Sequence, residues 1–244
     1  MFASEELFDE CVRMAGGVRV KEIVGASPSF DNADYLFKSD KVVGEHKSLQ
    51  KDFLTNRATE ENMHELYNNW FQEGKVGPAY GRVIIRTDQL PSDCAWELIS
   101  LFKKPLRRRL AKANKQIALI KERLGYSEAL GVLFLSNDGN FTLDPAMTAH
   151  LLHHSLNSDF SHIDHVILLS ANLTIALPES LIAHFPFFSV RLTNRRMPPE
   201  EFLNRLGTCW NEVLRDATGK NLPALSGFQS VDPGQIDKMR FRQA

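Results

Sequence analysis

Residues 34–47 read Asp34-Tyr-Leu-Phe-Lys-Ser-Asp-Lys-Val-Val-Gly-Glu45-His46-Lys47 and predict a β-hairpin. Apolar, strand-favouring residues lie on both sides of a polar turn at 38–41. Because successive side chains of a strand point to opposite faces, Glu45 and Lys47 should point the same way and His46 the other way. The hairpin therefore predicts a carboxylate beside an ammonium, with the carboxylate of Asp34 one strand away.

This group of side chains suits a hard divalent cation and a positioned water. The pattern resembles the PD-(D/E)XK nuclease superfamily, with Asp34 in the aspartate position and Glu45-His46-Lys47 as the D/E-x-K element. Pro28 precedes Asp31 by three residues and Asp34 by six, so two aspartates are candidates to lead the motif. The alternative is an ordinary hairpin in which Glu45 and Lys47 form a solvent-facing ion pair.

The resemblance implies a restriction-endonuclease-like α/β fold that hydrolyses phosphodiester bonds, in DNA in preference to RNA, with Mg²⁺ or Mn²⁺ as the cofactor. It implies that the carboxylates of Asp34 and Glu45 and the backbone carbonyl of His46 bind the metal, while Lys47 orients the attacking water. Superfamily members often add a glutamate from the first helix, and Glu5 is the one we expect. The helix dipole alone would also favour a glutamate there. A role in bacterial or phage defence or in DNA processing is implied as well.

A second chemical feature is a basic run over residues 103–123, which contains nine cations and one acid. Helical spacing places four of the cations on one flank: Lys104, Arg108, Lys112 and Lys115. Apolar residues line another flank, so one face should pack on a sheet while the other presents cations to phosphates. The resemblance implies that this helix flanks the active site, where Lys112 and Gln116, one turn apart, could reach a scissile phosphate or an active-site water. A merely solvated helix face is the alternative.

The composition is that of a soluble globular protein: 244 residues, of which 43% are hydrophobic and 24% charged, with a net charge of -1. No apolar run is long enough for a membrane helix, and the N-terminal residues do not form a secretory signal. Three cysteines lie far apart, which argues against disulfides and cysteine-built zinc sites and fits a reducing cytoplasm.

The order of predicted elements is that of a mixed α/β domain over residues 1–218, with a central sheet flanked by helices and an insertion at about 51–102. Helices are predicted at 4–15, 60–73, 93–124 (interrupted or kinked at Pro105), 145–156 and 198–215. Besides the hairpin, strands are predicted at 18–24, 80–86, 129–136, 165–170 and 187–193. A polar tail over 219–244, rich in glycine and proline, should be partly disordered.

Other functions stay open at this point. His150 and His154 have a spacing that can bind zinc, but no HExxH glutamate accompanies them, so we expect ordinary surface or core histidines. A nuclease-like module that binds nucleic acid or regulates without turnover is one rival; an unrelated α/β interaction protein is another. The expected partners are DNA, or RNA, together with a second copy of the chain or a partner protein, and no membrane.

Overall fold

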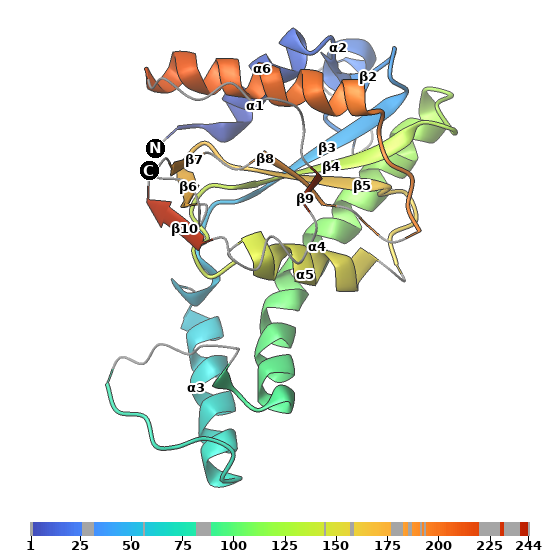
Figure 1. The fold of residues 1–244 in the computed structure, drawn as a ribbon. Helices are drawn as coiled ribbons and strands as arrows, with labels where there is room; N and C mark the ends of the chain where they lie inside the picture. Colours follow the sequence, from blue (N-terminus) through green and yellow to red (C-terminus); the bar gives the residue numbers. More distant parts are fainter. Residues whose placement is uncertain are drawn as a thin grey trace.

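The computed structural model describes residues 2–25, 32–55, 57–81, 89–143, 145–156, 159–176, 183–184, 187–190, 192, 194–219, 230–231 and 240–243. Within this part of the chain, a seven-stranded mixed sheet has the order β1-β2-β3-β4-β5-β8-β9. Its strands are β1 (Val18–Arg19), β2 (Tyr35–Phe37), β3 (Val42–Leu49), β4 (Leu130–Asn137), β5 (His165–Leu169), β8 (Phe187–Val190) and β9 (Ser230–Val231). Helices cover both faces, so the α/β architecture with a central mixed sheet is confirmed (Figure 1).

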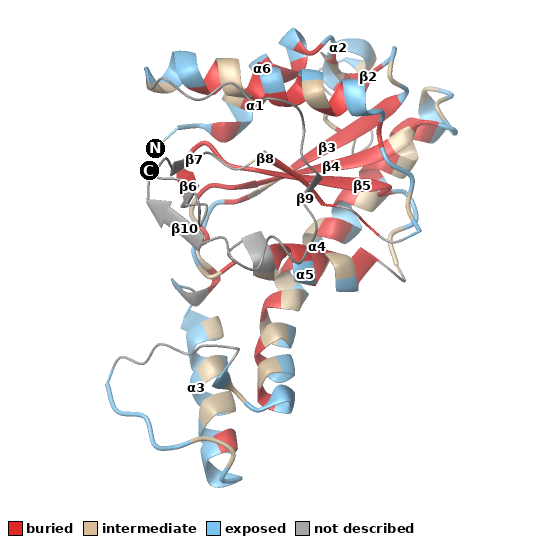
Figure 2. Ribbon diagram, in the orientation of Figure 1, coloured by how far each residue is buried: buried red, intermediate tan, exposed pale blue. Residues whose placement is uncertain are grey.

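Helices α1 (Ser4–Met14) and α6 (Glu200–Thr218) cover one face, and α4 (Ser92–Arg123) and α5 (Pro145–Leu156) cover the other (Figure 1). Each face has its own apolar core, and the residues coloured as buried in Figure 2 lie along the sheet and on the inner sides of the helices. The α1/α6 side is centred on Phe8, Phe134 and Trp210, and the α4/α5 side on Leu110 and Ile117.

The predicted hairpin is present. Strands β2 and β3 pair antiparallel, with Leu36 opposite Val43, and the turn closes where the Lys41 N–H donates to the Lys38 carbonyl. Strand β3 then pairs in parallel with β4, and β4 in parallel with β5. The apolar run predicted as a strand buried on both faces is β4, which lies at the centre of the sheet, as continuous hydrophobicity indicates.

The predicted strand at 18–24 is wrong beyond its first two residues. Strand β1 ends at Arg19, and α2 (Val20–Val24) follows directly. Its only partner among the described strands is the three-residue β2, and the Val20 N–H donates to the carbonyl of Asp34, where that partner begins. With no further ladder to join, the chain turns into a helix that ends at Gly25, whose φ of 92° suits a glycine.

Of the interruption or kink predicted at Pro105, the interruption does not occur, because α4 is a single helix of 32 residues that contains this proline. A proline inside a helix costs about 3 kcal/mol. The apolar flank on both sides of it, including Phe102, Leu106 and Leu110, is buried in the core and offsets that cost. The predicted insertion boundary near residue 102 therefore falls inside a continuous helix.

The first part of α4 extends beyond the sheet and is accompanied by α3 (Arg57–Gln72), so the two helices form an arm (Figure 1). Buried Trp70 joins them, since its indole N–H donates to Glu97 at 2.7 Å. A short 3-10 turn, η1 (Phe53–Thr55), leads into the arm. Most of the strand predicted at 80–86 lies outside the described residues, and Tyr80 and Gly81 are not in a strand.

The remaining strands lie toward the C-terminus. Strands β6 (Leu173–Ala176), β7 (Ala183–His184) and β10 (Arg240–Gln243) form a separate three-stranded sheet, in which β10 pairs with β6. Most of the predicted polar tail lies outside the described residues, although β9 and β10 belong to it. No described helix is long and apolar enough to cross a membrane.

Gly131 on β4 provides a test of this packing. A Cβ added there would overlap the backbone carbonyl oxygen of His162, and the backbone cannot yield as a flexible side chain can. We expect Gly131→Ala to lower the free energy of unfolding by about 3 kcal/mol, the upper range for overpacking. Urea denaturation measures this, with Gly77→Ala as control, since a Cβ at Gly77 meets nothing within 4 Å. Equal stability of the two variants would contradict the β4 packing.

Candidate active site

The hairpin brings two predicted site carboxylates together. Asp34 lies directly before β2, and its Oδ2 accepts a hydrogen bond of 2.9 Å from the backbone N–H of His46. This bond joins the start of β2 to the middle of β3 and holds the Asp34 carboxyl next to Glu45. The other candidate aspartate, Asp31, lies outside the described residues. Asp34 is thus the aspartate that the described structure places beside the glutamate.

Glu45 is buried, with a residue exposure of 0%. Its Oε1 accepts a hydrogen bond from the ammonium of Lys47, whose side chain is 17% exposed. Its Oε2 is buried and receives no hydrogen bond from the residues that the structure describes. The alternative of a solvent-facing Glu45–Lys47 pair is therefore wrong, because the carboxylate is removed from water.

Burial is the main reason why the pKa of Glu45 is raised to about 8. The negative charge of Asp34 raises this pKa further, and a protonated Glu45 can donate a hydrogen bond to the Asp34 carboxyl. Lys47 acts in the opposite direction through its charge and its hydrogen bond, but it does not outweigh burial and Asp34. In the absence of a cation, Glu45 is thus largely protonated at neutral pH.

Lys47 is held from two sides. Besides Glu45, its Nζ donates to Oε1 of Gln116 at 3.0 Å, and Gln116 Nε2 in turn donates to the carbonyl of Asn32 at 2.7 Å. Gln116 is 7% exposed on α4. It therefore positions the ammonium and ties the loop before β2 to the helix. The sequence pointed to Gln116 as a contact to a scissile phosphate or an active-site water, and nothing in it indicated the Asn32 carbonyl.

His46 points to the opposite face, as strand alternation requires. Its ring stacks on Phe8 of α1 with centroids 5.6 Å apart, and Nε2 lies 3.1 Å from the hydroxyl of Ser136. Burial lowers the pKa of His46, which favours the neutral ring. Glu5 is exposed on α1, and its charge acts on His46 from that side. The structure does not bring Glu5 to Glu45, so a place for Glu5 in the metal shell stays a prediction.

The basic flank of α4 is placed as predicted. Its four cations are exposed, and the apolar flank behind them is buried: Leu106, Leu110, Ala113, Ile117 and Ile120. Gln116 belongs to the buried side, whereas Lys104, Arg108, Lys112 and Lys115 lie outside it. The helix thus presents cations to solvent and one amide to the site.

The donor set fits a hard cation. Two adjacent carboxyls, one with an oxygen that lacks a donor, form a buried negative site once Glu45 loses its proton, and a divalent ion would satisfy that site. The described residues contain no cluster of three or more His, Cys, Asp or Glu side chains suited to a metal, so backbone carbonyls and water would complete the shell. His150 and His154 pack against the ring of Trp96.

No protein-family model matches the chain, and searches of the curated proteins and of the solved structures find no match either. The function has to be inferred from the geometry of the site.

The raised pKa of Glu45 makes the stability of the metal-free protein depend on pH. Between about pH 5 and about pH 8, the folded state holds a proton that the unfolded state has lost, so stability should fall by up to about 1.4 kcal/mol per pH unit. Glu45→Gln should remove this fall. Urea denaturation in EDTA across this range measures the effect, with Glu6→Gln, an exposed residue of α1, as the control. Parallel pH profiles for wild type and Glu45→Gln would contradict the buried, uncompensated carboxyl.

Proposed function

We propose that the protein is a metal-dependent nuclease with a PD-(D/E)XK-type centre on a restriction-endonuclease-like fold. The observation that supports this most is the Glu45 carboxyl, buried beside Asp34 with one oxygen lacking a donor. A buried acceptor oxygen without a hydrogen-bond donor destabilises a fold, and such strain is typical of functional sites. The hairpin followed by parallel strands in a mixed sheet agrees with the proposal.

Each residue has a distinct role in the proposed reaction. Asp34 and Glu45 would hold Mg²⁺ or Mn²⁺ through carboxylate oxygens, and the carbonyl of His46 would provide a third oxygen. A metal ion held by these groups would polarise a phosphoryl oxygen and lower the pKa of a bound water. Lys47, held by Glu45 and Gln116, donates a hydrogen bond to the attacking water and offsets negative charge that develops on the phosphate.

Gln116 is a positioning residue in this scheme. By accepting from Lys47 and donating to Asn32, it limits the ammonium to a small set of orientations. A lysine side chain loses about 2 kcal/mol of conformational entropy when it is held in one orientation. The hydrogen bonds of the folded protein hold the Lys47 side chain in place before substrate binds. The ammonium can then orient a water without a further loss of conformational entropy.

Substitutions in the centre test catalysis. Asp34→Asn, Glu45→Gln and Lys47→Met should each reduce Mg²⁺- or Mn²⁺-dependent cleavage of DNA by about 100-fold or more, because each acts on the metal or the water. The assay follows plasmid, linear and single-stranded DNA, with RNA in parallel, in Mg²⁺, Mn²⁺ and EDTA. Glu6→Gln should cleave like wild type.

Cleavage that survives Glu45→Gln would exclude this centre. A protein that retards nucleic acid equally in EDTA and in metal, and never cuts it, would be the binding module instead. A protein that does neither would be an α/β protein of another function. Far-UV circular dichroism of each variant checks that the fold is retained.

Metal binding can be tested without turnover. A cation needs the ionised carboxylate, so binding must displace the proton of Glu45, and affinity should rise as pH increases toward about 8, by up to tenfold per pH unit. The rise in melting temperature caused by Mg²⁺ or Mn²⁺ should therefore be larger at about pH 8 than at about pH 6. Asp34→Asn should lose most of this rise. Above about pH 8, where Glu45 is ionised, the variant should be about 1 kcal/mol more stable than wild type in EDTA, since the repulsion between the two carboxylates is relieved.

An Asp34→Asn variant that is less stable in EDTA, and gains as much from metal as wild type, would identify Asp34 as a structural residue of the hairpin.

A further inference from the structure

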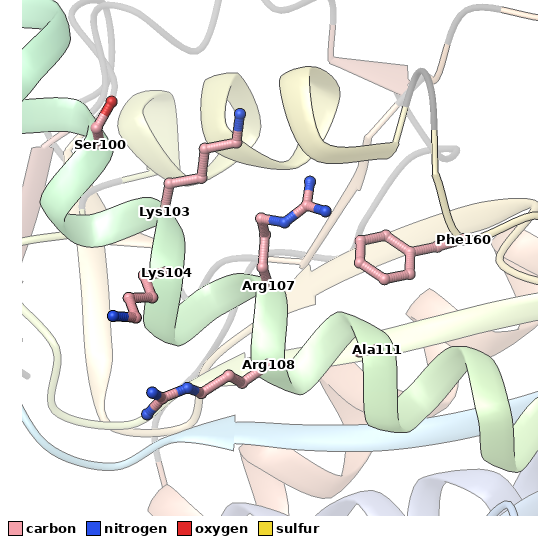
Figure 3. Close-up of a pocket in the computed structure, with 7 residues that line it drawn as sticks. All are labelled: Ser100, Lys103, Lys104, Arg107, Arg108, Ala111 and Phe160. Atoms are coloured by element: carbon pink, nitrogen blue, oxygen red, sulfur yellow. The ribbon is translucent and has the colours of Figure 1, made fainter.

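A hollow on the outer side of α4 lies away from the candidate active site. Its volume is about 440 Å³, and four cations and one aromatic ring line it: Lys103, Lys104, Arg107, Arg108 and Phe160. In Figure 3, Lys103 and Arg107 project to the side of the helix where Phe160 lies, whereas Lys104 and Arg108 project to the other side. This size is in the range of small-ligand pockets and suits a nucleotide unit.

The aromatic side of the hollow is built with unusual backbone geometry. Phe160 has a φ of 63°, in the left-handed region that bulky residues rarely adopt. The Arg107 guanidinium lies 5.3 Å from the centre of its ring and pairs with Asp159 at 2.8 Å. These contacts hold a ring and a planar cation together at the edge of the hollow, and both can stack on a base.

A second ring continues the surface toward the arm. Trp96 is 48% exposed, and it contacts His150 and His154 of α5 with centroids 5.6 and 5.8 Å away. The Nδ1 of His154 lies 3.2 Å from Nζ of Lys103, which lines the hollow. Trp96, Lys103 and Arg107 also share one face of α4, since they are spaced by seven and four residues. We call this continuous region, Trp96 with the residues of the hollow, the basic–aromatic surface.

We propose that the basic–aromatic surface binds single-stranded nucleic acid. Cations along a groove track phosphates, and exposed rings stack on bases, which is the combination that single-strand binders use. Trp96 and Arg107 are eleven residues apart, about 16 Å along the helix, which is room for several nucleotides between the two stacking positions. A duplex would engage the cations alone, because its bases are already stacked, and Trp96 would have no role.

The surface also leads toward the candidate centre. Lys104, Arg108, Lys112 and Gln116 follow each other every four residues, in steps of about 6 Å along α4. The first two line the hollow, and the last bonds Lys47. The basic residues thus follow α4 toward the turn whose buried Gln116 contacts the candidate centre, and we expect a strand bound on the surface to extend in that direction. Only this last step rests on the proposed nuclease function; single-strand binding itself does not.

Binding is measured with Glu45→Gln protein in EDTA, so that neither metal nor cutting contributes. The probes are labelled thymidine and uridine oligonucleotides and a duplex of equal length. We expect the single strands to bind about tenfold or more tightly than the duplex. Adding Trp96→Ala should weaken single-strand binding by about 5- to 100-fold and leave duplex binding unchanged. Tyr80→Ala is the matched control, because Tyr80 is 88% exposed on the arm and lies outside the surface.

Tryptophan fluorescence gives an independent readout, since Trp70 and Trp210 are each only 1% exposed. Single strands should quench the exposed Trp96, and the quenching should disappear in Trp96→Ala. Lys104→Ala and Arg108→Ala should each lower the slope of log affinity against log salt by about 0.7, the value for one phosphate of a single strand. Lys21→Ala, an exposed cation on α2, should leave the slope unchanged.

Equal affinity for single strands and duplex, together with no effect of Trp96→Ala, would overturn the proposal. So would polyglutamate that competes as well as an oligonucleotide, because the surface would then fit an acidic protein segment. Single-strand binding without cleavage by the wild type would leave this inference standing and reject the nuclease. Cleavage by the wild type, together with unchanged single-strand binding in Trp96→Ala, would support the nuclease and reject the single-strand surface.

Discussion

The burial of the Glu45 carboxyl is the constraint on which the site depends. One oxygen is bonded to Lys47, the other lacks a described donor, and the charge of Asp34 lies beside both. A buried acceptor without a partner costs about 1–3 kcal/mol, and more when it is charged. The fold maintains this arrangement because β3 is paired on both sides and covered by helices on both faces. Strain of this kind is relieved by a proton or by a cation, and the raised pKa of Glu45 means that the carboxyl favours the proton when no cation is bound.

Helix α4 links the core, the site and the surface. Its apolar flank fills the core on one face of the sheet, and Gln116 on that side reaches Lys47. Near its C-terminal end, buried Lys121 pairs with Asp164, which also accepts from Arg196 and from the N–H of Gly131. These bonds fix the helix against β4 and the start of β5. The rigid position of α4 is what allows a single amide to orient an ammonium on another element.

Much of the local structure follows from short-range patterns. The hairpin, β4, β5, α5 and α6 lie close to where alternation, continuous hydrophobicity and helical spacing predict them, because each pattern reports which faces are buried. The structure differs from these predictions where a local rule met a tertiary constraint. The strand predicted at 18–24 had too short a partner to pair with, and Pro105 lies in a helix whose buried flank offsets the loss of one hydrogen bond.

The sequence by itself determined that Glu45 and Lys47 share one face of a strand and that His46 takes the other, because side-chain alternation is a property of the extended backbone. It also determined that one flank of α4 is cationic, since helical spacing is equally local. Only the tertiary structure decided that Glu45 is withdrawn from water and that Lys47 is held by Gln116, 69 residues away. The same holds for Trp96 and Phe160, which join the basic flank through contacts with α5 and with Arg107. Such contacts depend on how distant segments pack, and no periodicity within one segment encodes that packing.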